Sequence, residues 1–174
     1  MARAFAGFMV RNAAHFKRWD PPQPATVGTT AHWRRVLAGA VREFRNGSSL
    51  RWALFDANDR NGSRLLGRIN FTQIFRGPFQ SCVLGYQLDV DAEGKGLMFE
   101  ALRAALDDLF IARRMHRVQA AFVPENVRSA KLLERLGFER IGLARRYLFI
   151  DGAWRDHVLS ALTHDDPDAT LLED

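Results

Sequence analysis

The chain has 174 residues, of which 47% are hydrophobic and 26% charged, a composition typical of one soluble domain or at most two small ones. No apolar run approaches the roughly 18 residues of a membrane-spanning helix, and the start lacks the sustained apolar core of a signal peptide. The net charge of +5 permits attraction to the phosphates of a cofactor or of RNA without requiring nucleic acid. We therefore expect a cytoplasmic protein with no membrane partner.

The first half of the chain predicts two helices followed by three strands. The apolar residues within 2–17 indicate a helix, and the prolines between residues 21 and 24 then force an extended loop. Thr29 or Thr30 can cap a second helix over 31–46. Strand-like runs follow, interrupted by turns, at 50–55, 65–75 and 81–90.

The second half alternates helices with strands and ends in a hairpin. A helix over 97–113 precedes a strand over 117–123. Asn126 can cap a short helix that Gly137 terminates. The last two strands, at 138–150 and 154–162, form a hairpin across Asp151-Gly152.

This order predicts an α/β (α+β) fold, a single domain over 1–164 with a mixed, mostly antiparallel sheet flanked by helices. The unit around helix 97–113 should be a right-handed crossover between parallel strands. The acidic segment 165–174 is predicted to be a frayed, disordered tail.

The single cysteine, Cys82, excludes an internal disulfide and fits a reducing compartment. It lies in an apolar strand, so we expect a buried, inert thiol rather than a nucleophile. The five histidines lack the spacing of metal ligands, and one cysteine cannot complete such a set. The sequence therefore predicts no metal site.

The most informative segment is Glu93-Gly94-Lys95-Gly96-Leu97-Met98, between a predicted strand and a predicted helix. Two glycines spaced by one residue favour a backbone cradle for phosphate, because glycine lets an anion approach the amide N–H groups. The helix that follows offers unpaired N–H groups and the positive end of its dipole. Taken alone, the segment is equally compatible with an ordinary glycine turn.

Two common nucleotide motifs do not fit this segment. A P-loop requires Lys and Ser or Thr after its last glycine, whereas Leu97 and Met98 follow Gly96. A dinucleotide fingerprint requires a third glycine three residues after the second, and that position is Phe99. What remains is a pyrophosphate cradle of another kind.

The ordered set of motifs resembles the GNAT acetyltransferase superfamily, and within it the RimJ/RimL group of ribosomal-protein N-terminal acetyltransferases. The resemblance spans most of the chain and is carried by residues 11–16, 19–21, 84–86, 94–102, 126–129, 132–139 and 150–157. It implies a single GNAT-like domain that uses acetyl-CoA and no metal. It also implies transfer of an acetyl group from acetyl-CoA to the N-terminal α-amine of a protein, such as a ribosomal protein, by direct attack on the thioester.

The resemblance assigns a set of residues to cofactor binding, namely Leu88, Val90, Gly94, Lys95, Gly96, Leu97, Met98 and Asn126. Two positions depart from the family pattern: Glu93 replaces the usual Gln or Arg, and Met98 replaces Gly or Ala. A carboxylate beside a pyrophosphate would repel it, so we expect Glu93 to point outward. Backbone amides then bind the anion, since each hydrogen bond to a charged group contributes about 1.5–3 kcal/mol.

The resemblance also implies catalytic residues. Asn126 would hold the cofactor, and Ser129 would act as an acid or stabilise the departing thiolate, because Leu133 stands where the family often has Tyr. Taken alone, the two residues are better explained as structural, Asn126 as a helix cap and Ser129 as a packing residue. The backbone N–H at or near Leu88 is implied as the oxyanion donor.

The acceptor side is less defined by the sequence. Candidate residues lining an acceptor groove, each also compatible with ordinary packing, are Trp19, Tyr86 and Tyr147. No dedicated base is evident. An α-amine has a pKa of roughly 7.7–8.0 and a lysine amine one of about 10.4, so the missing base weakly favours an N-terminal amine. A buried Asp or Glu with a raised pKa would also serve.

Two alternative functions stay open. One keeps the fold and acetyl-CoA but changes the acceptor to a small amine, such as an aminoglycoside or a polyamine. The other is a non-catalytic module that binds RNA or ribosomes, which the lack of a basic cluster with interleaved aromatics disfavours. Direct nucleic-acid binding is not required for the leading hypothesis.

The N-terminus departs from the family as well. The family usually begins with a strand before its first helix, whereas this chain starts almost inside that helix. Either the strand is absent or the start has been assigned too far downstream. An exposed sheet edge would result, which the partner subunit of a homodimer could cover.

Overall fold

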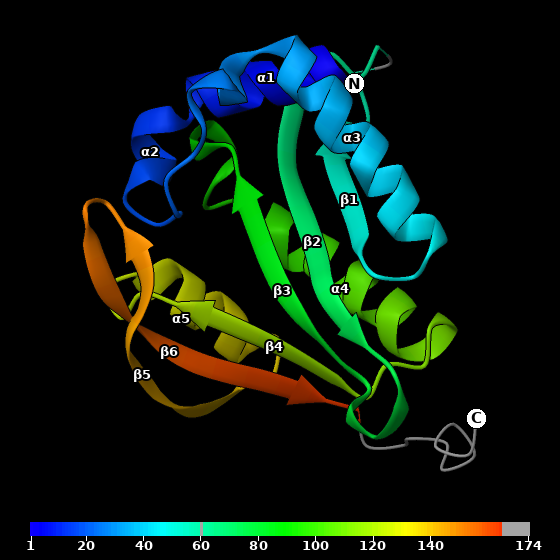
Figure 1. The fold of residues 1–174 in the computed structure, drawn as a ribbon, viewed down its shortest axis with the longest axis vertical. Helices are drawn as coiled ribbons and strands as arrows, with labels where there is room; N and C mark the ends of the chain where they lie inside the picture. Colours follow the sequence, from blue (N-terminus) through cyan, green and yellow to red (C-terminus); the bar gives the residue numbers. More distant parts are fainter. Residues whose placement is uncertain (60, 165–174) are drawn as a thin grey trace.

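The computed structural model describes residues 1–59 and 61–164, so the expected acidic tail at 165–174 lies outside the described residues. Helices and strands follow one another in the predicted order (Figure 1). In chain order they are α1 (Ala2–Arg11), α2 (Ala13–Lys17), α3 (Thr30–Arg45), β1 (Leu50–Phe55), β2 (Leu65–Phe75), β3 (Ser81–Leu88), α4 (Leu97–Asp107), β4 (Arg117–Phe122), α5 (Val127–Arg135), β5 (Glu139–Ile150) and β6 (Ala153–Thr163). None of the helices in the described ranges is long and apolar enough to cross a bilayer.

The strands form one mixed sheet in the order β1-β2-β3-β4-β6-β5. In the described part of the chain, β3 and β4 pair in parallel and the other neighbours pair antiparallel. Helix α4 makes the crossover between the parallel strands, so the predicted mixed and mostly antiparallel sheet is confirmed. No strand precedes α1 in the described ranges, and β1 therefore lies at one edge of the sheet. The homodimer expected to cover that edge stays a prediction.

Helices cover both faces of the sheet, and the sheet separates two hydrophobic clusters. The larger cluster joins the sheet to α4 and α5, and its fully buried members include Leu102, Leu109, Val118 and Phe71. The smaller cluster joins β2 to α1 and α3 through side chains that include Phe8 and Trp33. In Figure 1, α4 and α5 lie behind the strands and α3 lies in front of β1.

Asn12 interrupts the helix predicted over 2–17 and separates α1 from α2. The Asn12 side chain is fully buried. Its Nδ2 donates to the Phe8 carbonyl at 3.0 Å, and its Oδ1 accepts from the Val90 N–H at 2.9 Å. The break therefore ties the first helix pair to the chain just beyond β3.

Strand β3 ends at Leu88, so the strand predicted to run to Val90 is two residues too long. The Asp89 side chain accepts from the Asp91 N–H and starts a 3-10 turn over Val90–Ala92. A side chain that bonds its own neighbouring backbone competes with strand pairing. The helix predicted over 97–113 is α-helical only as far as Asp107, where α4 ends. The next five residues, Asp108–Ala112, form a π-helical segment.

The parallel strands β3 and β4 pair over only part of their lengths. Residues 81–84 of β3 pair with 117–120 of β4. Beyond these residues β3 continues to pair with β2, and β4 with β6. The two strands separate at their C-terminal ends, as Figure 1 shows. Backbone polar groups facing the separation are free to bind a ligand that enters between the strands.

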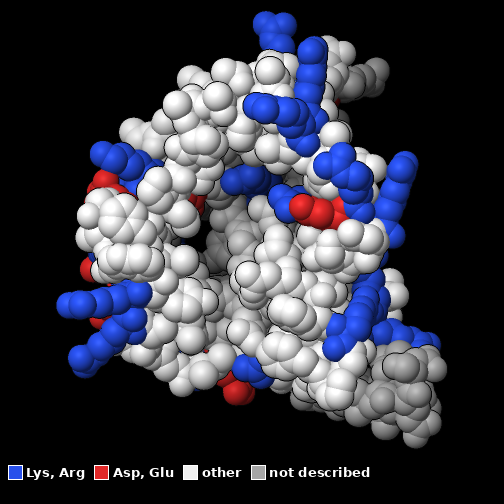
Figure 2. Space-filling view, in the orientation of Figure 1, with Lys and Arg blue, Asp and Glu red and all other residues white. Residues whose placement is uncertain are grey.

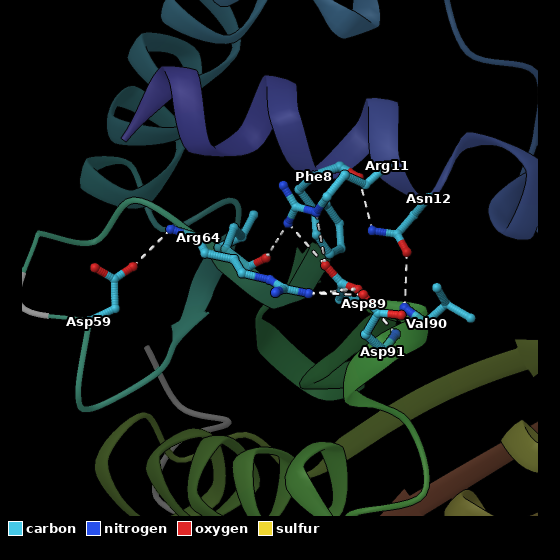
Figure 3. Close-up of polar contacts among 9 residues, drawn as sticks. Phe8, Arg11, Asn12, Asp59, Arg64, Asp89, Val90 and Asp91 are labelled. Atoms are coloured by element: carbon cyan, nitrogen blue, oxygen red, sulfur yellow. Dashed lines mark hydrogen bonds and ion pairs between the residues drawn. The ribbon is translucent and has the colours of Figure 1, made fainter.

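A buried carboxylate, that of Asp89, fixes the end of β3 (Figure 3). Asp89 is 1% exposed, and its Oδ2 accepts from Arg11 Nη2 at 2.9 Å. The same Arg11 nitrogen donates to the Leu65 carbonyl at 3.1 Å, and Arg64 Nη2 lies 3.7 Å from Asp89 Oδ1. The carboxylate thus joins α1, β2 and the loop that leads to Glu93.

Replacing Asp89 by Asn should lower the free energy of unfolding at pH 7 by about 1.5–3 kcal/mol, the range for hydrogen bonds to a charged group. Urea denaturation measures the loss. Asp91→Asn is the matched control, because the Asp91 side chain is 73% exposed and its N–H still donates to Asp89. The control should stay within about 0.5 kcal/mol of the native protein.

Acid should remove the difference between the native protein and Asp89→Asn. Burial alone would raise the pKa of Asp89, but the hydrogen bonds from Arg11 and the Asp91 N–H, with the Arg11 charge, lower it. A group with a lowered folded pKa stabilises fully above its unfolded pKa, about 3.9, and loses that contribution as the pH falls through the folded value. Equal stability of the two proteins at pH 7 would contradict this role for Asp89.

Candidate active site

The glycine loop before α4 forms an open backbone cradle. Gly94 and Gly96 have φ angles of +75° and +77°, a region that only glycine adopts at little cost. Apart from the glycine itself and the residues next to it in the chain, no described residue has a heavy atom within 4 Å of the place that a Cβ would take at either glycine. Among the described side chains, none caps the first turn of α4. The first N–H groups of α4, which have no partner within the helix, are thus left without a side-chain cap beside an uncrowded glycine loop, an arrangement suited to an anion.

Glu93 does not point freely outward, as we expected from the sequence. Its side chain is 22% exposed and lies between two helices. Glu93 Oε1 is 3.0 Å from His15 Nε2 of α2, and Oε2 pairs with Arg128 Nη1 of α5. These two contacts hold the carboxylate in place, and the Arg128 guanidinium offsets its charge next to the glycine loop.

The other residues predicted to bind the cofactor differ in burial and in hydrogen-bond partners. Met98 is 5% exposed, packs in the core, and has its Cε 3.4 Å from where a Cβ on Gly67 would stand. The Met98 side chain, which replaces the Gly or Ala usual in the family, is therefore buried in the core. Lys95 Nζ donates to the Asp91 carbonyl at 2.7 Å on the surface. The Val90 N–H already donates to Asn12, so it is not a donor for a cofactor, whereas Leu88 lies in the separated part of β3.

Ser129 and Tyr86 form a hydrogen-bonded pair, which joins a predicted catalytic residue to a predicted substrate residue. Tyr86 Oη lies 2.6 Å from Ser129 Oγ. Asn126 Oδ1 accepts from the Ser129 N–H at 3.1 Å, so Asn126 is the N-cap of α5 and positions Ser129. Burial raises the pKa of the Tyr86 phenol to about 12, against the effect of its hydrogen bond with Ser129. The phenol therefore stays protonated at neutral pH.

On the other face of β3, sequence reasoning missed a polar cluster of Asp20, Gln87 and Arg68. Gln87 Nε2 donates to Asp20 Oδ2, and Arg68 Nε donates to Gln87 Oε1 at 2.5 Å. The Arg68 guanidinium also lies over the Trp33 ring, 5.4 Å from its centroid, within the limit of about 6 Å for a cation–π contact. Burial raises the pKa of Asp20 to about 6, opposed by the Arg68 charge, the Gln87 hydrogen bond and the charge of His15.

The available sequence signal for this cluster was the Trp19-Asp20-Pro21 segment, which carried part of the family resemblance. It did not indicate partners, because Gln87 and Arg68 meet Asp20 only through the pairing of β2 with β3. Figure 2 shows this face of the molecule hollowed where β3 and β4 separate, with basic side chains around the hollow and along α3.

The other two predicted acceptor residues lie in separate segments, Trp19 after α2 and Tyr147 in β5, and Cys82 is buried in β3. Trp19 is partly buried and stacks with the Arg18 guanidinium at 5.0 Å. Tyr147 is 45% exposed on β5, with its ring 5.3 Å from that of His157. Cys82 is buried as predicted, and burial raises the pKa of its thiol to about 12. A nucleophilic thiolate at this position is therefore excluded at neutral pH.

Comparison with known proteins agrees with this geometry. Residues 2–139 match the acetyltransferase (GNAT) domain family. The [ribosomal protein uS5]-alanine N-acetyltransferase of Escherichia coli is 41% identical over 162 residues, which are 92% of this chain and 81% of that protein.

Solved structures show the same arrangement. The ribosomal-protein-S5-alanine acetyltransferase of Vibrio fischeri superposes with a TM-score of 0.91 at 34% identity, covering 96% of this chain and 90% of the other. RimJ of Mycobacterium smegmatis, in complex with CoA-disulfide, superposes with a TM-score of 0.87 at 29% identity and covers 94% of this chain and 78% of the other. The resemblance found in the sequence is thus confirmed.

Proposed function

The chain belongs to the GNAT family of acetyltransferases, and we propose that it transfers the acetyl group of acetyl-CoA to the N-terminal α-amine of a ribosomal protein. The observation that carries the proposal is the separation of β3 from β4 beside an open glycine loop. Relatives named as ribosomal-protein alanine acetyltransferases, aligned over nearly the whole chain, support the choice of acceptor. The reaction would take place in the cytoplasm, where ribosomal proteins are made.

The residues present fit acetyl-CoA. The N–H groups at Gly96, Leu97 and Met98 would bind the pyrophosphate, since a helix N-terminus with free amides favours negative charge. The separated part of β3, with Leu88, would bind the pantetheine arm through its backbone. Arg128 at the rim is 75% exposed and adds a positive charge beside the loop.

The chemistry is direct transfer. The amine nitrogen attacks the thioester carbonyl carbon, a C–N bond forms, and the C–S bond breaks. The departing thiolate takes a proton, and the Tyr86–Ser129 pair is suited to supply it because the phenol stays protonated. The attacking nitrogen loses a proton to give the amide.

An α-amine is the easier acceptor at neutral pH. Freeing an amine of pKa roughly 7.7–8.0 at pH 7 costs about 1.2 kcal/mol, whereas a lysine amine of pKa about 10.4 costs about 4.6 kcal/mol. The difference amounts to more than a hundredfold in reactive amine. It supports a protein N-terminus over a lysine side chain.

A thiol-release assay tests the proposed acceptor. Peptides beginning with Ala, Ser and Met are compared with their N-acetylated forms and with spermidine and an aminoglycoside. We expect CoA release with free N-termini, greatest with Ala, and none with the blocked peptides. The buried Cys82 should not contribute to the thiol signal. Release with the small amines alone would refute the proposed acceptor and favour a small-amine acetyltransferase.

Gly96→Val should raise the KM for acetyl-CoA by about 10- to 100-fold, the loss expected when one charge-assisted hydrogen bond of about 1.5–3 kcal/mol is removed. Gly47→Val is the matched control, because Gly47 also has a positive φ, +74°, with no described atom near its Cβ position, but lies at the end of α3. Steady-state kinetics at saturating peptide measure both. An unchanged KM in Gly96→Val, or an equal rise in Gly47→Val, would remove the loop from cofactor binding.

Ser129→Ala and Tyr86→Phe should each lower kcat by at least about tenfold with little change in the KM for acetyl-CoA, because a proton donor acts on the departing thiolate. The double variant should lose little more than either single one, since the two hydroxyls act as a unit. Ser63→Ala, an exposed serine near Asp59, is the control and should keep the native kcat. A native kcat in both single variants would exclude the pair from the mechanism.

A further inference from the structure

The carboxylate of Asp20 has no role in the steps of acetyl transfer given above. It lies in the loop after α2, where its N–H donates to the Phe16 carbonyl at 2.8 Å and fixes the backbone. Gln87 of β3 donates to its Oδ2. A carboxylate accepts up to about four hydrogen bonds, so Asp20 retains the capacity to bind a further donor.

Gln87 is oriented toward Asp20 by Arg68. An amide can present either its oxygen or its nitrogen to a neighbour. Because Arg68 Nε donates to Gln87 Oε1, the amide nitrogen is the end that faces Asp20. The three residues form a chain of hydrogen bonds from β2 through β3 to the loop after α2. Asp20 is thereby held at a fixed place beside β3.

That place lies beside the separated part of β3. Gln87 and its neighbour Tyr86 both belong to the stretch of β3 that no longer pairs with β4. Successive strand residues point to opposite faces, and Tyr86 packs with the α4–α5 core while Arg68, the partner of Gln87, contacts Trp33 of α3. The Tyr86–Ser129 pair and Asp20 therefore flank this stretch from opposite faces of the sheet.

We infer that Asp20 binds the α-ammonium group of the acceptor and takes its proton, on the face of β3 opposite to the Tyr86–Ser129 pair. The inference rests on the proposed function for the position of the thioester between β3 and β4. A proton passes from the ammonium nitrogen to the Asp20 carboxylate, directly or through one water, and then to solvent. The freed nitrogen attacks the carbonyl carbon, and the thiolate departs on the Ser129 side.

The charges around Asp20 suit this role. The groups that face it are Arg68 from β2, His15 from α2 and the neutral Gln87 from β3, and burial raises the pKa of Asp20 to about 6. At neutral pH the carboxylate is largely ionised, yet it is more basic than an ordinary Asp. Its pKa lies about 2 units below that of an α-ammonium and about 4 units below that of a lysine. Proton transfer to Asp20 is therefore less unfavourable from an α-ammonium than from a lysine ammonium.

The test is Asp20→Asn, which keeps the volume and an oxygen that can accept from Gln87. The native enzyme should show a bell-shaped dependence of kcat/KM on pH for an Ala-peptide, with limbs near 6 and near 8. Asp20→Asn should lose about 100-fold at pH 6.5, the lower end for a general base, and its activity should rise to a plateau above pH 8. Asp56→Asn, an exposed turn residue that accepts from the Asn58 N–H, should keep the native profile.

Two further readouts separate this role from a purely structural one. Asp20→Asn should keep the native KM for acetyl-CoA, and calorimetry in the presence of CoA should show at least tenfold weaker binding of the free Ala-peptide with unchanged binding of its N-acetylated form. Native pH dependence and native peptide affinity in Asp20→Asn would overturn the inference.

Failure of the proposed function gives a different result. In that case the native enzyme would release CoA with small amines and not with peptides. A loss of that small-amine activity in Asp20→Asn, confined to pH below 8, would still support the role of Asp20 toward the amine. Equal small-amine activity in both proteins would overturn it.

Discussion

The buried carboxylate of Asp89 determines where β3 ends, and the positions of the loop and of both faces of the site depend on that end. Asp89 holds Arg11 of α1 and starts the turn over Val90–Ala92. Asn12 adds a second tie by accepting from the Val90 N–H. These contacts join the first helix to the chain four residues before Gly94. The glycine loop, the proposed cradle for the pyrophosphate, is therefore anchored on its N-terminal side.

The end of β3 separates the two side-chain pairs to which we assign the proton transfers. Because β3 leaves β4 after Leu84 and stays with β2, its last residues are held on one side and open on the other. Side chains that alternate along this stretch reach opposite faces. Tyr86 reaches Ser129 in the first turn of α5, and Gln87 reaches Asp20. One strand that is paired on a single side therefore places the proposed proton donor and the proposed proton acceptor one strand residue apart.

The sequence predicts the elements well and the contacts between them poorly. Periodicity, caps and turn residues such as Thr29, Asn126 and Gly137 are local signals, and the helices and strands they predict are present. The turn that Asp89 starts with the Asp91 N–H is local, but the pairing of its carboxylate with Arg11, 78 residues away in sequence, is not. The pairing of Glu93 with His15 and Arg128 is equally non-local. Local patterns cannot indicate such partners, since the strand register and helix packing decide them.

Desolvation has opposite chemical consequences at the two faces of β3. Burial raises the pKa of Tyr86 to about 12 and that of Asp20 to about 6. For a phenol the increase secures the protonated form, a proton donor, at neutral pH. For a carboxylate the same effect leaves the ionised form dominant but strengthens it as a proton acceptor. The proposed acid and the proposed base thus differ by the intrinsic chemistry of the two groups, and burial shifts the pKa of each in the direction that its proposed role needs. Arg68 limits the effect at Asp20, because without its charge burial would raise that pKa further and leave less ionised carboxylate to receive the proton.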